Sequence, residues 1–495
     1  MTALGDFSTT LIYGAVVAAT FISVWMGLNT STLSIPIALA DEFPNAKKRL
    51  EYYTFNSRKA LVKDYSQFND QVFALATNGG VNCVIPREFL DNLKSHKELS
   101  FAATLEDVAQ QKYTSVGGLP DFGVKVMTGK LNPSLTAYTP IIHNMVRENW
   151  PECFGGAEWT SINVYTPLLR LVAQISGRVF NSTEASKSEQ WIQLATVYVS
   201  EVIPYAHKLK TWPECLRPFV SRYIPGYEAL HAQRTSAKEM IAATLRRKKE
   251  SGGAPLEDPP SMLDHLASGK HADLIDDLEQ QFFLQMTLIV ASVHTSASTT
   301  TQSLFDLAVH SECIPELRDE ARAVLAESGG VFTRAALAKL KKLDSFIKEV
   351  QRFNSPDLTT FQRIALAPLT LPNGLHVPKG TKLELATGAI NLDDDVWPDA
   401  RTFDGLRFYR MRQADPEREA KHQFISVSKT ELAWGYGRHS CPGRWLADIV
   451  IKTILAEFLL RCDIKNPEGR GRWESLEIDG NILPNEEGEV LVRSL

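Results

Sequence analysis

The sequence predicts a mainly α-helical protein with small β-sheets and one N-terminal transmembrane helix. Three features lead to this fold class: an uncharged apolar stretch near the start, several segments with apolar residues at helical spacing, and short apolar stretches broken by Gly and Pro. The 495 residues are 44% hydrophobic and 22% charged, which suits a protein with a large core. The net charge of −5 is mild and argues against a nucleic-acid-binding protein, which usually carries a basic stripe.

The first element is the expected membrane anchor. Residues 7–40 contain no Asp, Glu, Lys or Arg, and residues 11–28 (LIYGAVVAATFISVWMGL) approach the ~20 apolar residues that cross a bilayer. A removable signal peptide is the main alternative, but the run is long and no basic residue precedes it; a buried core helix is the other. A basic cluster at residues 47–49 follows the span, so the positive-inside rule places the rest of the chain in the cytosol. We expect residues 1–30 to form the anchor.

The first half of the remaining chain is predicted to be mostly helical. Residues 47–66 and most of residues 105–248 show apolar residues at helical intervals. Residues 72–86 carry a Gly-Gly turn between two apolar stretches, which is typical of paired strands. The polar, Pro- and Gly-rich residues 246–261 predict a surface loop between helices.

The second half begins with the longest predicted helix, residues 272–310, which lacks Gly and Pro and is apolar nearly all round at its centre. A second helix over residues 335–353 should end before Pro356, because the residue preceding proline disfavours helix. Residues 366–386 turn twice at Pro- and Gly-containing sequences and predict small β-hairpins. A final helix is expected from near Cys441 to about Leu460.

Cys441 is the most prominent of six widely spaced cysteines. No pair has CxxC spacing, which argues against a zinc site and a disulfide framework. Cys441 stands in the segment WGYGRHSCPGRWLA, between glycines that permit close approach of a flat ligand, and just before the predicted final helix. A helix N-terminus and a nearby Arg438 favour a thiolate over a thiol. From these residues alone, metal ligation, nucleophilic catalysis and a purely structural cysteine all remain open.

This segment closely resembles the cysteine-ligand loop FxxGxRxCxG of the cytochrome P-450 family. Gly437, Cys441 and Gly443 match the pattern, while Trp434 stands at the Phe position and His439 at the Arg position. The resemblance implies that Cys441 is the metal ligand, donating its thiolate sulfur to the iron of haem b. It also implies that His439 donates to a haem propionate, more weakly than Arg would and with pH dependence. The loop residues assigned to haem binding are Cys441, His439, Trp434, Gly435 and Gly437.

Two further segments resemble motifs of the same family. Glu349 and Arg352 form its ExxR motif and lie three residues apart, on one face of the predicted helix. The segment FDGLRF at residues 403–408 resembles the family's FxPxRF and contains Arg407. The resemblance implies that Glu349, Arg352 and Arg407 form a buried ion network that braces the cysteine loop. It also implies that Arg363, in the strand after the ExxR helix, contacts a haem propionate.

The segment ASVHTS at residues 291–296 resembles the oxygen-binding motif AGx(D/E)T(T/S). The resemblance assigns catalysis to Thr295, which would relay protons, and to His294, which stands where an acid is usual. His294 could either donate protons or face away from the site. A threonine hydroxyl in an apolar helix commonly bonds its own i−4 carbonyl, and this remains the alternative for Thr295. By family position, the substrate pocket would be lined by Val290, Ala291, Leu358 and Thr359.

The resemblance therefore implies a cytochrome P-450 fold, with residues 31–495 as the haem-binding catalytic domain. The implied activity inserts oxygen from O2 into a lipophilic small molecule, and we expect a secondary metabolite of terpenoid, meroterpenoid or indole type. The sequence has no G-x-G-x-x-G dinucleotide motif after a strand, so we expect electrons from NADPH–cytochrome reductase, with cytochrome b5 as a second possible partner. The expected location is the endoplasmic reticulum membrane, single-pass, with a cytosolic catalytic domain. The alternatives are a reductase-independent haem-thiolate isomerase or dehydratase, a non-catalytic haem sensor, and a thiol hydrolase.

Overall fold

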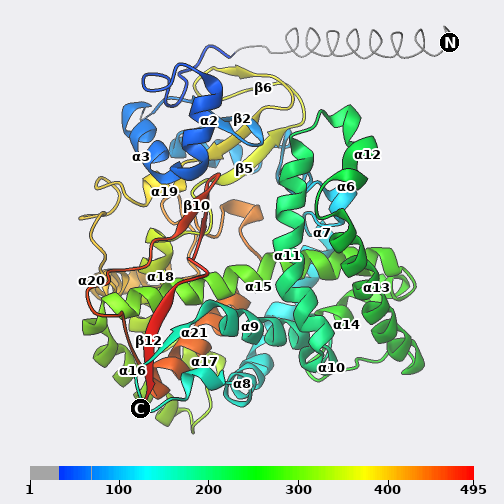
Figure 1. Cartoon of the computed structure of the whole chain (residues 1–495), viewed down its shortest axis with the longest axis vertical. Coiled ribbons are helices and arrows are strands. Elements are labelled where there is room, and N and C mark those ends of the chain that lie inside the picture. Colours follow the sequence, from blue (N-terminus) through cyan, green and yellow to red (C-terminus); the bar gives the residue numbers. More distant parts are fainter. Residues whose placement is uncertain (1–32, 69) are drawn as a thin grey trace, which may run out of the picture.

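The computed structural model describes residues 33–68 and 70–495, and it places a β-rich part beside a larger helical part (Figure 1). The β-rich part combines N-terminal residues with strands from the last third of the chain. The expected anchor, residues 1–30, lies outside the described residues. Within the described residues, no helix combines the length and the apolar character needed to cross a membrane.

The main sheet has five strands in the order β1-β2-β8-β5-β3. The predicted strand pair around Gly79 and Gly80 is β1 and β2, which are antiparallel; Gly80 has φ +107°, a conformation that glycine adopts readily. A second sheet has the order β4-β12-β9, and β6–β7 and β10–β11 are hairpins. The strands are β1 (Phe73–Thr77), β2 (Gly80–Val84), β3 (Leu99–Ser100), β4 (Thr160–Asn163), β5 (Thr360–Ala365), β6 (Leu369–Thr370), β7 (His376–Val377), β8 (Lys382–Leu385), β9 (Cys462–Lys465), β10 (Leu476–Ile478), β11 (Asn481–Leu483) and β12 (Glu489–Ser494).

The helices make up most of the described chain. The longer ones are α2 (Ala46–Phe55), α3 (Ser57–Phe68), α5 (Phe101–Ala109), α8 (Asn132–Glu148), α9 (Tyr165–Phe180), α11 (Glu189–Lys210), α13 (Tyr227–Glu250), α15 (Leu278–Val309), α16 (Ile314–Glu327), α18 (Lys341–Phe353), α20 (Arg407–Ala414) and α21 (Arg444–Arg461). The shorter ones are α4 (Leu90–Leu93), α6 (Gln111–Thr114), α7 (Asp121–Val126), α10 (Thr183–Lys187), α12 (Arg217–Val220), α14 (Met262–Leu266), α17 (Arg334–Leu337) and α19 (Thr387–Ile390). The mainly helical fold with small sheets agrees with the sequence prediction.

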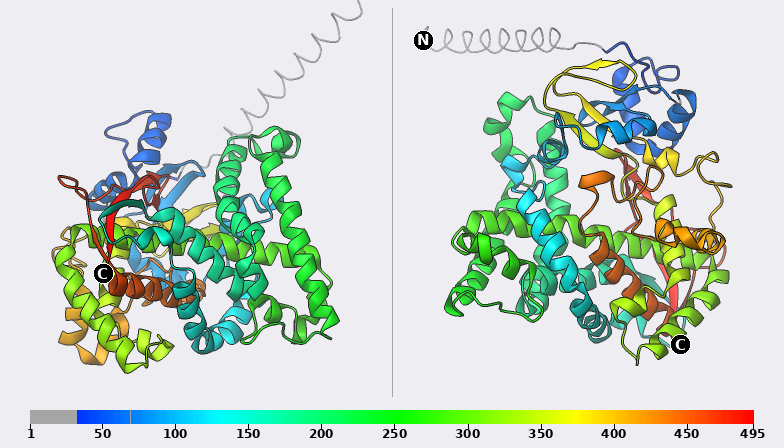
Figure 2. Two further views of the ribbon diagram at one scale, coloured as in Figure 1. Left: turned by 60° about the horizontal axis from the view of Figure 1, so that its bottom comes forward. Right: turned by 180° about the vertical axis from the view of Figure 1, so that it is seen from behind.

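Helix α15 crosses the whole helical part, and the other long helices pack around it (Figures 1 and 2). Its side chains join those of α8, α9, α11, α18 and α21 in the largest apolar core. Burial on nearly every side explains why its centre is apolar all round. Two smaller apolar clusters lie between the main sheet and α3 or α4.

Several predicted boundaries were wrong by a few residues. Helix α15 begins at Leu278 and not at residue 272, because the side chain of Asp277 caps it by accepting the Gln280 N–H at 2.9 Å. The helix expected over residues 335–353 is divided into α17 and α18. The carboxylate of Glu320 accepts the backbone N–H of Lys342 at 2.8 Å, which starts a new helix there.

The helix expected over residues 47–66 is likewise divided, into α2 and α3 at Asn56, and α13 extends five residues into the predicted loop at residues 246–261. The final helix begins at Arg444, three residues beyond Cys441. Local periodicity therefore located these elements, whereas side chains that accept backbone N–H groups, Asp277 nearby and Glu320 further away in sequence, set where α15 and α18 begin.

Gly177 tests the tight packing around α9. A Cβ atom added to this helical glycine would lie 2.8 Å from the Ser186 Cα and 2.8 Å from the Trp191 Nε1. We expect Gly177→Ala to lower the free energy of unfolding by about 1–3 kcal/mol, because backbone atoms must move to make room. Gly129→Ala is the control, since a Cβ there would meet nothing within 4 Å. Thermal unfolding measures both, and equal midpoints for the two variants would contradict the packing described.

Candidate active site

The loop around Cys441 has a backbone that depends on glycine. Gly435 and Gly437 have φ of +77° and +68°, and a Cβ on Gly435 would lie 3.3 Å from the His439 carbonyl oxygen. The Cys441 N–H donates to the Trp434 carbonyl at 2.7 Å, which closes the loop. Cys441 is therefore presented at the end of a tight turn, immediately before α21.

The surroundings of the Cys441 sulfur suit a metal ligand. Burial raises the pKa of the thiol, while the backbone N–H groups of Gly443 and Arg444 and the Arg444 guanidinium lower it. Donors aimed at the sulfur can stabilise a thiolate, but burial makes a thiolate costly without a positive partner. A bound metal ion supplies that partner.

Trp434 anchors the start of the loop. Its indole N–H donates to the Phe424 carbonyl at 2.7 Å, and the two rings meet edge to face with centroids 5.3 Å apart. These contacts hold Trp434 in place, and its carbonyl oxygen accepts the hydrogen bond from the Cys441 N–H. Trp434 thus determines the position of the cysteine through its own backbone.

A group of basic residues lies beside the loop. The Arg363 side chain, on β5, is 3% exposed and lies over the rings of Phe101 and Phe361 at 5.0 and 4.5 Å. Burial and the charge of Arg438 lower its pKa to about 10. Within residues 33–68 and 70–495, no carboxylate forms an ion pair with Arg363. A buried guanidinium without an acidic partner fits an anionic group brought by a ligand, such as a haem propionate.

His439 has a different role in this group from the one expected. Its Nε2 accepts a hydrogen bond from the Arg438 Nε at 2.9 Å. Burial, followed by the charges of Arg363 and Arg438, lowers its pKa to about 4. The geometry therefore argues against donation from the Nε2 atom to a propionate. A neutral His439 instead orients Arg438.

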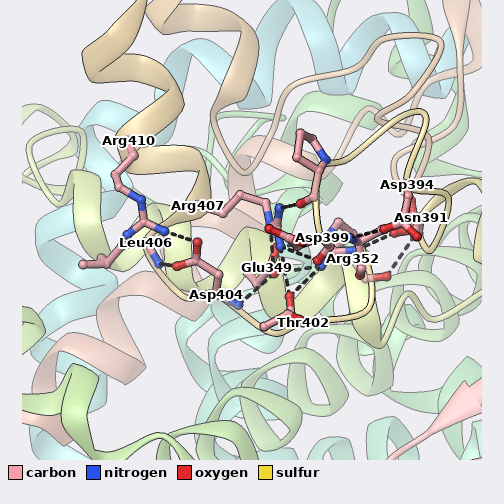
Figure 3. Close-up of polar contacts among 12 residues, drawn as sticks. Glu349, Arg352, Asn391, Asp394, Asp399, Thr402, Asp404, Leu406, Arg407 and Arg410 are labelled. Atoms are coloured by element: carbon pink, nitrogen blue, oxygen red, sulfur yellow. Dashed lines mark hydrogen bonds and ion pairs between the residues drawn. The ribbon is translucent and has the colours of Figure 1, made fainter.

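Glu349, Arg352 and Arg407 meet in one buried network (Figure 3). The Arg352 Nε and Nη2 donate to the two carboxylate oxygens of Glu349 at 2.9 and 2.8 Å, and the Arg407 Nε donates to Oε1 at 3.1 Å. Glu349 is 0% exposed. The Asp404 N–H also donates to Glu349, at 3.0 Å. One carboxylate thus joins α18 to the start of α20.

The guanidinium groups of this network also bind backbone carbonyls. Arg352 donates to the carbonyls of Asn391 and Ala400, and Arg407 donates to those of Pro398, Asp399 and Thr402. The segment between α19 and α20 is therefore wrapped around two charged side chains. Such carbonyl acceptors carry no signal in a sequence, so only the charged members could be predicted.

The face of α15 that carries Thr295 differs from the rest of the helix. Ala291 and Thr295 are exposed, whereas Val293, between them, and Ser296, next to Thr295, are buried. Residues four apart share a helix face, so the two exposed residues border one open space. The Thr295 hydroxyl donates to the Ala291 carbonyl at 2.8 Å, the local bond named above as the alternative.

The proposed catalytic role of His294 conflicts with its position. Its Nδ1 lies 3.0 Å from the Tyr165 hydroxyl and its Nε2 lies 3.0 Å from the Thr196 carbonyl oxygen. Burial lowers its pKa, so the neutral ring is favoured. Both ring nitrogens are used in packing α15 against α9 and α11. His294 therefore faces away from the open face at Thr295, which is the second of the two alternatives given above and speaks against its assignment to catalysis.

The expected pocket residues are only partly placed on that open space. Leu358 is 1% exposed and packs in the apolar cluster with Tyr53 and Leu61, so its assignment to the pocket was wrong. Thr359 is 6% exposed and bonds the carboxylate of Glu384. Val290 is half-buried against the main core, and Ala291 is exposed.

Comparison with known proteins supports the resemblance of the cysteine loop. A family model described as "Cytochrome P450" matches residues 135–492. The chain is 32% identical over 442 residues to cytochrome P450 monooxygenase AN1598 of Emericella nidulans, covering 87% of this chain and 82% of that protein. It is 30% identical to ent-kaurene oxidase P450-4 of Gibberella fujikuroi, covering 94% and 93%.

Among solved structures, the haem domain of cytochrome P450DA has a TM-score of 0.70 to this chain at 16% identity. The alignment covers 93% of this chain and 98% of that domain. At this identity, the likeness concerns the fold.

Glu349→Gln tests the buried network. The variant leaves two buried guanidinium groups without their carboxylate, so we expect a loss of about 3–5 kcal/mol in the free energy of unfolding. Glu327→Gln is the control, because that side chain is 61% exposed in a surface ion pair with Lys339. Thermal unfolding of the purified proteins measures the effect. A Glu349→Gln midpoint equal to that of the control would show that the network does not stabilise the fold.

Proposed function

Because the chain belongs to the cytochrome P450 family of monooxygenases, which bind haem through a cysteine thiolate, we propose that Cys441 is its haem ligand. The observation that supports this most strongly is the tight glycine turn that presents a half-buried sulfur to the N-terminal N–H groups of α21. Arg363 and Arg438 would bind the propionates. The haem, when bound, supplies the activation of O2 for oxygen insertion.

The residues of the chain then position substrate and protons. The Thr295 hydroxyl holds a proton on the open face of α15, where its local bond to the Ala291 carbonyl can be exchanged by rotation of one side chain. Ala291, on the same face, leaves room beside the hydroxyl. The surrounding apolar core excludes water from the other faces of α15. This arrangement supports oxygen insertion rather than nucleophilic hydrolysis by Cys441.

The proposed substrate is a lipophilic secondary metabolite of terpenoid, meroterpenoid or indole type. One observation supports this class: the similarity over 94% of the chain to a protein named ent-kaurene oxidase. Electrons would come from NADPH–cytochrome reductase, with cytochrome b5 as a further donor.

We also propose that residues 1–30 anchor the protein in the endoplasmic reticulum membrane, with the catalytic domain in the cytosol. The absence of charge over residues 7–40 supports this. The segment between α11 and α13 adds large exposed apolar side chains: Trp212, Phe219 and Tyr223 are 42%, 70% and 72% exposed. An exposed group of this kind is typical of a surface that contacts a partner or a membrane.

Cys441→Ala tests the proposed ligand. We expect the variant to lose bound haem and the red-shifted Soret band of the reduced, carbon-monoxide-treated protein, because that band requires a thiolate ligand. Cys313→Ala is the matched control, since Cys313 is also partly buried and lies outside the loop. Absorption spectra and the ratio of haem to protein give the result. An unchanged band in Cys441→Ala would overturn the assignment.

Deletion of residues 1–30 tests the anchor. We expect the full chain to stay in the membrane pellet after alkaline carbonate extraction, because a spanning helix is not removed by high pH. The shortened chain should move to the supernatant, where its haem spectrum can be compared with that of the full chain. Complete extraction of the full chain would refute a spanning segment.

A further inference from the structure

Asp357 carries a carboxylate and stands among residues of the chain whose side chains are buried. It lies in the segment between α18 and β5, and its side chain is exposed, whereas Ser355, Leu358 and Thr359 are 1%, 1% and 6% exposed. Burial nevertheless raises its pKa to about 6. Water can reach this side chain, yet the protein surrounds it closely enough to disfavour its charge. These two properties together indicate that Asp357 lines an interior space.

The segment that carries Asp357 is held against the face of α15 that bears Thr295. Gln302 lies seven residues after Thr295, which is two helical turns and roughly 10 Å further along the same face. The Gln302 side chain donates to the Ser475 hydroxyl at 2.9 Å, and Ser475 donates to Asn354 at 3.2 Å. Asn354 precedes Asp357 by three residues. The segment that carries Asp357 is therefore bound, through Asn354, to the part of α15 that lies two turns beyond Thr295.

The β10–β11 hairpin holds Asp357 from the other side. The backbone of Asp357 pairs with that of Asn481, and the Leu358 N–H donates to the Gly480 carbonyl at 2.8 Å. This hairpin lies between the β-rich part and α15 (Figure 1). Leu358, next to Asp357 in the chain, is buried in the apolar cluster, whereas the Asp357 side chain is exposed and lies outside that cluster.

The charged groups on the adjoining elements do not neutralise Asp357. The nearby acidic groups have other partners: Asp306 pairs with Arg472, and Glu477 pairs with Arg58. Glu384 accepts a hydrogen bond from the Asn82 amide, and Asp479 accepts one from the Asn78 N–H. The Arg363 guanidinium lies over two aromatic rings. Within residues 33–68 and 70–495, the Asp357 side chain has no hydrogen bond or ion pair. A carboxylate in such a position is stabilised when a ligand brings a positive charge.

We infer that Asp357 is a specificity-determining residue that binds the protonated amine of a lipophilic substrate. The inference rests on the proposed function and narrows it: among the proposed metabolites, those with a basic nitrogen would be preferred. The ammonium group would pair with Asp357 while the apolar remainder lies along α15. A substrate without a cationic group would leave the carboxylate buried and unpaired, which disfavours its binding.

The test measures binding to the full-length, haem-loaded protein. The probes are dodecyltrimethylammonium, whose fixed charge cannot ligate iron, and 1-dodecanol, its neutral counterpart, both below their aggregation limits. We expect Asp357→Asn to weaken binding of the cation roughly tenfold, the effect of about 1.4 kcal/mol, and to keep or strengthen binding of the alcohol, which no longer leaves a charge unpaired. Asp357→Glu should retain most of the preference. Asp319→Asn, on the surface of α16, is the control and should bind both probes like the wild type.

The pH dependence provides a second readout by equilibrium dialysis. The cation keeps its charge at every pH, so its affinity for the wild type should fall as the pH drops through about 6 and Asp357 is protonated. Asp357→Asn should show little change over this range. Equal affinity of the wild type and Asp357→Asn for the cation would overturn the inference. A protein without the red-shifted carbon monoxide band would instead refute the proposed haem-thiolate function, so the two failures are distinguishable.

Discussion

The carboxylate of Glu349, buried between the guanidinium groups of Arg352 and Arg407, constrains the part of the chain that leads to the cysteine loop. The three charges must be ordered together, because a buried charge without its partner is strongly unfavourable. The same helix, α18, also binds the segment just before the loop: Lys348 pairs with Glu431 at 2.7 Å, and Asp344 accepts the Phe424 N–H at 3.0 Å. One helix thus holds two parts of the chain that lead to the loop.

The two sides of the site differ in how polar groups are used. On the cysteine side, positive side chains gather beside the loop, and Arg363 is left without an acidic partner among the described residues. On the side of α15, the polar groups near Thr295 are uncharged, and Asp357 adds one carboxylate. Thr295 bonds its own helix, His294 is turned away, and Asp357 is left alone. The first arrangement suits an anionic cofactor, and the second suits a largely apolar substrate with one positive group.

Much of the fold could be predicted from sequence, and so could the motif residues, because both depend on local spacing. The period of apolar residues located α15 and α18, and the three-residue spacing of Glu349 and Arg352 gave a pair on one helix face. The orientation of His294 could not be predicted, because it depends on a hydroxyl 129 residues away. Leu358 was misplaced for a similar reason. Which of the two adjacent side chains, Asp357 or Leu358, enters the apolar cluster depends on contacts with residues far away in the sequence.

His439 has a consequence for how this loop can vary. It stands between two arginines as a neutral acceptor, so the group carries two fixed positive charges rather than three. An arginine at position 439 would add a third cation, next to a guanidinium that is already buried. His439 therefore supplies Arg438 with a hydrogen-bond acceptor without adding a charge, and leaves two guanidinium groups to meet an anionic ligand.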